Sequence, residues 1–142
     1  MEVKFNIPYL AENQEKYTLA SLRSLRHCGN LAYGKRCVDY LKKRYNFGEV
    51  FLTPSCTAAM EMGAILAELG VGDEVILPSY TFSSTANAVV LRGVKPVFCE
   101  VSKDTLNINV DHLESLITKK TKMILPNDYA GIPCEIDRIM NC

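Results

Sequence analysis

The sequence predicts an α/β fold built on a mainly parallel sheet with flanking helices. From about residue 49 onward, short apolar runs alternate with longer stretches of helical character. The apolar runs are Val50–Leu52, Glu74–Leu77, Pro96–Phe98 and Lys122–Leu125. Strands that alternate with helices at this spacing indicate β-α-β crossovers, and such crossovers join parallel strands.

Two helices are expected before the first of these runs. Apolar side chains recur at helical intervals within residues 12–26, which predicts an amphipathic helix. These side chains are Tyr17, Leu19, Leu22 and Leu25. Glycines and an asparagine predict a loop over residues 27–34, and a second helix is expected over residues 35–45. We therefore predict an N-terminal helical segment over residues 1–46 and an α/β domain over residues 47–142.

Three further helices are expected between the strands, over residues 57–69, 81–91 and 110–117. Gly70 and Gly72 follow the first of them in the sequence LGVGDE. Glycines at this position fit a helix C-terminal turn. That turn leads directly into the strand expected next.

Charge and composition exclude several classes of protein. The chain has 142 residues, of which 48% are hydrophobic, and this suits one cored domain or a piece of one. Lysine plus arginine equals aspartate plus glutamate at 16 each, so no net charge attracts nucleic acid or anionic membranes. No stretch approaches the roughly 20 apolar residues of a membrane span, and a cytoplasmic location is expected. The six cysteines form no C-x-x-C pair, so free thiols are expected rather than disulfides or a metal site.

A candidate anion site precedes the helix expected over residues 57–69. Ser55, Cys56, Thr57 and Ala58 stand where an expected strand gives way to that helix. Small side chains let the backbone approach an anion, Thr57 can donate from its hydroxyl, and the helix dipole favours negative charge. Phosphate is the natural occupant. The alternative is that Ser55 or Thr57 only caps the helix.

The loop after the strand at residues 74–77 strengthens the case for a ligand. It delivers Tyr80, Thr81 and Phe82 to the same edge of the predicted sheet. An aromatic ring beside a phosphate site suits a flat, phosphorylated cofactor, although Phe82 taken alone is more often a core residue. The G-x-x-x-x-G-K-[ST] and G-x-G-x-x-G patterns are absent, so nucleoside triphosphates and dinucleotides are not expected.

Four stretches in one order carry a likeness to a known family. They read LTPSCTAAMEM, GDEVILPSYTFSSTANAVVLRGVKPVFCEV, DTLNI and YAGIPCEID. Together they resemble the DegT/DnrJ/EryC1/StrS family of sugar-nucleotide aminotransferases, over nearly the whole chain. The resemblance implies a fold type I enzyme that uses pyridoxal 5'-phosphate (PLP) and forms a homodimer with active sites at the subunit interface. It also implies amino transfer, from glutamate, to a keto-sugar nucleotide.

The resemblance also implies roles for particular residues. Thr57 and Ala58 would hold the phosphate of PLP, with Cys56 beside them, and Phe82 would stack on the pyridine ring. Gly29 and Asn30 would lie in a loop near the substrate or the partner subunit.

Two catalytic groups of the family are not found in this sequence. The family uses a Schiff-base lysine and an aspartate at the pyridine nitrogen, in motifs that do not occur before Cys142. Lys119, Lys120 and Lys122 match no such motif and are expected to be surface residues. We therefore assign no catalytic residue and expect the chain to be the N-terminal part of a larger enzyme, inactive alone. Asp128 stands where the family usually has histidine, so the role of that position is open.

Two alternatives remain open from the sequence. One is a non-catalytic relic or subunit that keeps the phosphate site and the dimer surface. The other is a small independent α/β module that binds phosphate through Thr57 and Phe82.

Overall fold

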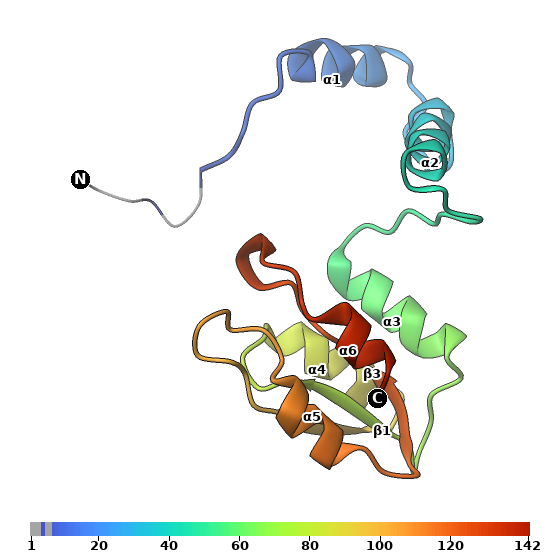
Figure 1. Ribbon diagram of the computed structural model, residues 1–142. Helices are drawn as coiled ribbons and strands as arrows, with labels where there is room; N and C mark the ends of the chain where they lie inside the picture. Colours follow the sequence, from blue (N-terminus) through green and yellow to red (C-terminus); the bar gives the residue numbers. More distant parts are fainter. Residues whose placement is uncertain (1–3, 5–6) are drawn as a thin grey trace. The chain divides into compact units, whose positions relative to one another are not determined.

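The computed structural model describes Lys4 and residues 7–142, which belong to two compact units, Met1–Leu52 and Thr53–Cys142 (Figure 1). Among the described residues, no helix is long and apolar enough to cross a membrane. The domain boundary after residue 46 stays a prediction.

The first unit contains the two helices predicted from the sequence, α1 (Gln14–Arg23) and α2 (Ala32–Tyr45). Both are mainly exposed, and neither contains a fully buried residue. The rings of Tyr17 in α1 and Tyr33 in α2 meet edge to face, with centroids 6.1 Å apart. Aromatic edge-to-face contacts are favourable, so this pair stabilises the packing of α1 against α2.

The strand expected over Val50–Leu52 does not form. These residues lie outside any helix or strand and pair with no strand among the described residues, and Phe51 and Leu52 are more than half exposed. An apolar run becomes a strand only where a neighbour supplies the hydrogen-bonded ladder. That part of the fold prediction is wrong.

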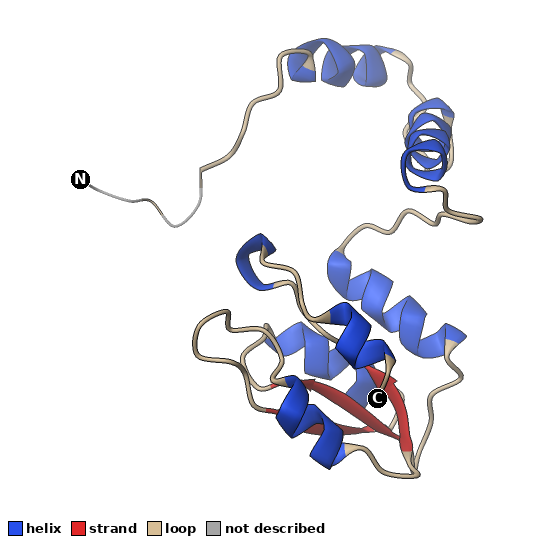
Figure 2. Ribbon diagram, in the orientation of Figure 1, coloured by secondary structure: helices blue, strands red, loops and turns tan. Residues whose placement is uncertain are grey.

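The second unit is built on a three-stranded sheet (Figure 2). Its strands, in the order β2-β1-β3, are β1 (Glu74–Pro78), β2 (Lys95–Cys99) and β3 (Thr121–Ile124). Both pairs are parallel, and Ile76 in β1 lies opposite Val97 in β2 and Ile124 in β3. The predicted α/β class with a parallel sheet is confirmed.

Four α-helices and one 3-10 turn accompany the sheet. They are α3 (Cys56–Leu66), α4 (Ser83–Val90), α5 (Val110–Leu116), η1 (Tyr129–Gly131) and α6 (Ile136–Met140). The first three correspond to the predicted helices. The sequence did not predict η1 or α6, because elements this short show no clear helical period.

The core occupies both faces of the sheet, because successive residues of a strand point to opposite sides. The cluster between the sheet and helices α3 and α4 consists of Ala64, Leu69, Val75, Leu77, Val89 and Val94. The cluster between the sheet and helices α5 and α6 consists of Ile76, Cys99, Ile108, Val110, Leu113 and Ile139. All five residues of β1 are buried, so β1 is the centre of the unit.

All six cysteines are free thiols. Cys99 is fully buried and donates a hydrogen bond to the carbonyl of Asn109 at 3.4 Å. Burial raises the pKa of the Cys99 thiol to about 11, so this side chain stays protonated near neutral pH. It therefore contributes to packing rather than to thiolate chemistry.

The strand order places a crevice at the carboxyl edge of the sheet. From β1 the chain passes through α4 to β2 on one side, and it then returns through α5 to β3 on the other side of β1. The loops that follow β1 and β3 therefore leave the sheet in opposite directions. In open parallel sheets this switch point is where ligands bind.

The opposite, amino end of β1 carries a buried carboxylate with two partners. Glu74 is 8% exposed, and its Oε1 accepts a hydrogen bond from Lys95 Nζ at 2.9 Å. Its Oε2 accepts from Thr118 Oγ1 at 2.8 Å. The hydrogen bond from Lys95, followed by that from Thr118, lowers the pKa of Glu74 below its ordinary value of 4.5.

This carboxylate is expected to make the protein acid-sensitive. The unfolded chain binds the Glu74 proton more readily, so the stabilisation is complete above pH 4.5 and is lost as pH falls through the lower folded-state pKa. Urea unfolding at about pH 7 and about pH 3.5 should show a smaller acid-induced loss for Glu74→Gln than for wild type. Equal losses in the two proteins would contradict this role.

Candidate functional site

A cavity of about 410 Å³ lies at the carboxyl edge of the sheet. Three segments line it: the start of α3, the start of α4 with the loop before it, and the loop after β3. Among the lining residues are Cys56, Thr57, Met60, Phe82, Leu125 and Asn127. The volume falls within the range of about 300–1,000 Å³ that is usual for small-molecule sites.

The start of α3 offers unpaired hydrogen-bond donors. Ser55 is the N-cap residue, and its Oγ accepts a hydrogen bond from the N–H of Ala58 at 3.1 Å. The N–H groups of Cys56 and Thr57 have no acceptor among the described residues. Ser55 therefore caps the helix, as the simpler alternative predicted, but the cap leaves two N–H groups for an anion.

Phe82 borders the cavity immediately before α4. Its side chain is 76% exposed, so it does not belong to the core. Beside it, the hydroxyls of Thr81 and Thr85 lie 2.9 Å apart and hydrogen-bond to each other, which connects the loop to the first turn of α4. An exposed ring on an anchored loop is available to cover the face of a flat ligand.

The loop after β3 forms the third side of the cavity. Asn127 lines the cavity, and its side-chain amide has no hydrogen-bond partner among the described residues. Asp128 is not among the residues that line the cavity. Its Oδ1 instead accepts a hydrogen bond from the N–H of Cys134 at 2.9 Å. Burial and, to a lesser degree, the Asp128 carboxylate raise the pKa of the Cys134 thiol. Asp128 is thus a residue that stabilises the loop.

A tyrosine pair joins the two loops that flank the crevice. The hydroxyls of Tyr80, after β1, and Tyr129, after β3, lie 3.3 Å apart, and the ring centroids are 5.1 Å apart. The hydrogen bond with Tyr80 raises the pKa of Tyr129. This contact holds the loop after β1 against the loop after β3.

The structure brings three of the predicted cofactor residues together. Cys56, Thr57 and Phe82 line the same cavity, whereas Ala58 is not among its lining residues and donates its N–H to the cap. Gly29 and Asn30, predicted near the substrate, belong to the other compact unit. Asn30 has a left-handed backbone with φ 58° and lines a separate cavity of about 450 Å³ within that unit.

The sequence did not single out Met60, Leu125 or Asn127. Asn127 had a usable signal, because residues that follow each parallel strand meet at the carboxyl edge of the sheet. The same rule led to Phe82. Met60 and Leu125 carry no comparable signal, since an apolar side chain in a helix or strand is normally part of the core.

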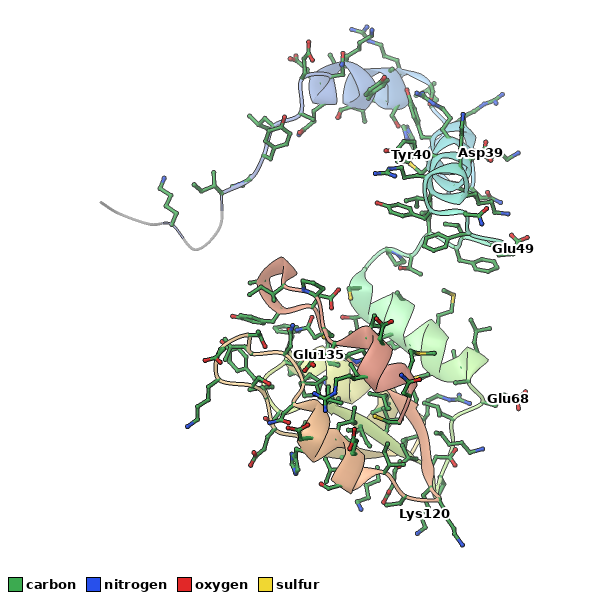
Figure 3. The ribbon with its side chains drawn as sticks, in the orientation of Figure 1. Asp39, Tyr40, Glu49, Glu68, Lys120 and Glu135 are labelled. Carbon is green, nitrogen blue, oxygen red and sulfur yellow. The ribbon has the colours of Figure 1, made fainter. Side chains whose placement is uncertain are left out.

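The lysines considered from the sequence lie away from the cavity. Lys119, Lys120 and Lys122 are exposed, as expected of surface residues. Figure 3 shows Lys120 beside the start of β3, and its carbonyl accepts the N–H of Glu74 at the amino edge of the sheet. Among the described residues, no lysine lines the cavity.

The arrangement belongs to a known family. Residues 22–142 match the family described as the DegT/DnrJ/EryC1/StrS aminotransferase family. The chain belongs to this family. A relative of this DegT/DnrJ/EryC1/StrS chain is the uncharacterized protein MJ1066 of Methanocaldococcus jannaschii, which is 45% identical over 86 residues. That match covers 61% of this chain and 22% of MJ1066.

Solved structures of similar proteins share the fold of this family member. Spr1654 of Streptococcus pneumoniae, a candidate sugar aminotransferase in its pyridoxamine phosphate (PMP) form, is 30% identical with a TM-score of 0.86. The match covers 99% of this chain and 35% of Spr1654, whose PLP form is also solved. NtdA of Bacillus subtilis, with bound PMP, is 27% identical with a TM-score of 0.83, over 99% of this chain and 34% of NtdA. The chain thus spans about a third of the length of these solved relatives.

Proposed function

We propose that the protein is a PLP-dependent sugar-nucleotide aminotransferase, and that its Thr53–Cys142 unit supplies the phosphate side and part of the ring side of the cofactor site. The observation that carries this proposal is the shared cavity of Thr57 and Phe82. It combines an anion-binding helix start with an exposed aromatic ring in a member of an aminotransferase family. Solved relatives contain PLP or PMP, and both of these cofactors combine a phosphate with a flat ring.

The residues at the cavity fit a phosphorylated pyridine. The N–H groups of Cys56 and Thr57 and the hydroxyl of Thr57 bind the phosphate, which the helix dipole also favours. Phe82 covers one face of the ring, while Met60 and Leu125 exclude water beside it. When bound, PLP supplies an electron sink that allows an amino group to leave or join a carbon atom.

Substrate and assembly follow from the family likeness. We propose a dTDP-4-keto-6-deoxyhexose as amino acceptor and glutamate as amino donor, in the biosynthesis of a cell-surface polysaccharide. The sequence likeness to dTDP-4-amino-4,6-dideoxygalactose transaminase supports this choice. Gly29 and Asn30 are proposed to contact the nucleotide sugar in a cytoplasmic homodimer.

A second candidate function is a phosphate-binding subunit without catalysis of its own. It is favoured by the absence of a lysine among the described residues that line the cavity. Catalysis through PLP requires an amine nucleophile. Borohydride reduction of the PLP-loaded chain, followed by mass mapping, tests this second function, because a specific adduct on one lysine would show that this chain supplies the amine and would rule the non-catalytic subunit out.

Cys56→Pro tests the phosphate site. Proline is tolerated at the first position of a helix, and Ser55 before it is extended, with φ −158° and ψ 162°, as residues before proline prefer. The change removes an N–H that bonds to no described residue, so the fold should survive. We expect a rise of about ten- to a hundredfold in the dissociation constants of both PLP and inorganic phosphate, because a hydrogen bond to a charged group contributes about 1.5–3 kcal/mol.

Ala32→Pro is the matched control, since it makes the same change at the first residue of α2. It should leave both dissociation constants unchanged. Thr57→Val, which removes only a hydroxyl, should weaken binding of both ligands. If neither Cys56→Pro nor Thr57→Val changes the dissociation constant of PLP, the start of α3 does not bind the phosphate.

A further inference from the structure

Asn107 is a buried polar residue to which the proposed function assigns no role. Its side chain is 5% exposed and makes two hydrogen bonds. Oδ1 accepts from the N–H of Tyr129 at 2.8 Å, and Nδ2 donates to the carbonyl of Ile132 at 2.9 Å. The side-chain amide of Asn107 thus bonds to the first residue of η1 and to the residue that follows η1.

Asn107 is itself held firmly by its own segment. It lies in the turn between β2 and α5, where Val101 and Ile108 form an isolated antiparallel bridge. Its carbonyl accepts the N–H of Ser102 at 2.9 Å, and its N–H donates to Thr105 Oγ1 at 3.2 Å. The side chain therefore projects from an anchored backbone.

The segment that Asn107 holds has an unfavourable backbone. Ala130 has φ 52° and Gly131 has φ 81°, both in the left-handed region. A non-glycine residue adopts that region only where its surroundings compensate for the cost. The two hydrogen bonds from Asn107, with the contact between Tyr80 and Tyr129, provide this compensation.

We propose that Asn107 is a positioning residue of the cofactor site, which holds the loop after β3 so that Asn127 stays in the wall of the cavity. This inference rests on the proposed function. Asn127 lies two residues before Tyr129, where the segment held by Asn107 begins. Its side-chain amide, which has no partner among the described residues, is available to the polar substituents of the pyridine ring. Asn107 lines no part of the cavity itself and acts through Asn127.

The phosphate and the pyridine ring of PLP should respond differently when the two hydrogen bonds of Asn107 are lost. The phosphate is bound at the start of α3, which does not depend on the loop after β3. The ring meets the wall only while the loop is in place, so the apparent dissociation constant rises as the fraction of ordered loops falls. Asn107 therefore affects binding of PLP but not of inorganic phosphate.

Asn107→Ala in the 142-residue chain tests this selectivity. We expect the dissociation constant of PLP to rise about tenfold while that of inorganic phosphate, followed by NMR titration, stays at the wild-type value. The amide of Tyr129 should also exchange faster with solvent. Asn107→Asp keeps an acceptor for Tyr129 but places a carboxylate oxygen against the carbonyl of Ile132, so it should also lose PLP affinity.

Glu74→Gln is the control for a general loss of stability, because Glu74 bonds to Lys95 and Thr118 at the opposite end of β1. It should leave PLP affinity unchanged. Should Asn107→Ala fail to fold, Tyr129→Phe, which removes only the hydroxyl bonded to Tyr80, must show the same selective loss.

The inference is overturned if the Asn107 variants bind PLP as tightly as wild type, or if they lose phosphate affinity equally. It is also overturned if Glu74→Gln loses as much PLP affinity as Asn107→Ala. A wild-type chain that binds phosphate but not PLP removes the proposed function and this inference together. Binding of PLP that depends on Cys56 but not on Asn107 removes the inference alone.

Discussion

Replacing Leu113 by alanine is expected to lower the free energy of unfolding by about 2–5 kcal/mol. Leu113 is fully buried in α5 and packs in the cluster with Ile76, Cys99 and Ile139. The change removes apolar contacts and leaves a cavity in a close-packed core. Because a small unit has about 5–15 kcal/mol of total stability, this loss is a large fraction of it. Urea unfolding followed by circular dichroism measures the effect.

Leu66→Ala is the matched control, because it makes the same change at a side chain that is 71% exposed at the end of α3. Its effect should stay within about 0.5 kcal/mol, as is usual for surface positions. Similar losses at Leu113 and Leu66 would mean that the cluster beneath α5 does not hold the unit together.

Two glycine-to-alanine changes are expected to act in opposite directions. Gly93 has φ +74°, and a Cβ there would lie 2.7 Å from Val71 Cγ2. Val71 is 90% exposed and can move aside, so the cost comes mainly from the left-handed backbone, about 1–2 kcal/mol. Gly63 lies inside α3, where a Cβ would meet no atom within 4 Å other than those of its own helical backbone, so Gly63→Ala should stabilise the protein by about 0.5–1 kcal/mol.

Thermal unfolding of the two variants provides this comparison, because each serves as the control for the other. Both remove a glycine from the unfolded chain and so change its entropy equally. A stabilising Gly93→Ala would show that the turn between α4 and β2 does not require the left-handed region in solution.

Local patterns were sufficient to predict most of the α/β unit. The apolar run at Glu74–Leu77 lies between turn residues and becomes the fully buried β1, since burial on both faces needs no alternation. The similar run at Val50–Leu52 pairs with no strand in the part of the chain that the structure describes. Nothing within three residues distinguishes the two, because pairing depends on segments far away in the chain.

The candidate site was predictable to the extent that it follows from sheet geometry. Cys56, Thr57 and Phe82 lie at the ends of elements that a parallel sheet brings to one edge, so the sequence order placed them together. Ala58 donates its N–H to Ser55, and although the sequence offered Ser55 as a possible cap, it did not show that this bond would use the N–H of Ala58. The role of Asn107 could not be predicted from the sequence, because its hydrogen-bond partners lie more than 20 residues away in the chain.

The strand order β2-β1-β3 also has a consequence for assembly of the unit during synthesis. β1 pairs with a strand that begins at Lys95 and with one that begins at Thr121, so the second pairing closes a much longer loop. Loop-closure entropy and the N-to-C direction of the ribosome both favour β1–β2 pairing first. The starts of α3 and α4 thus meet before β3 exists. In a growing chain, the phosphate side of the cavity and Phe82 therefore precede the wall that Leu125 and Asn127 form.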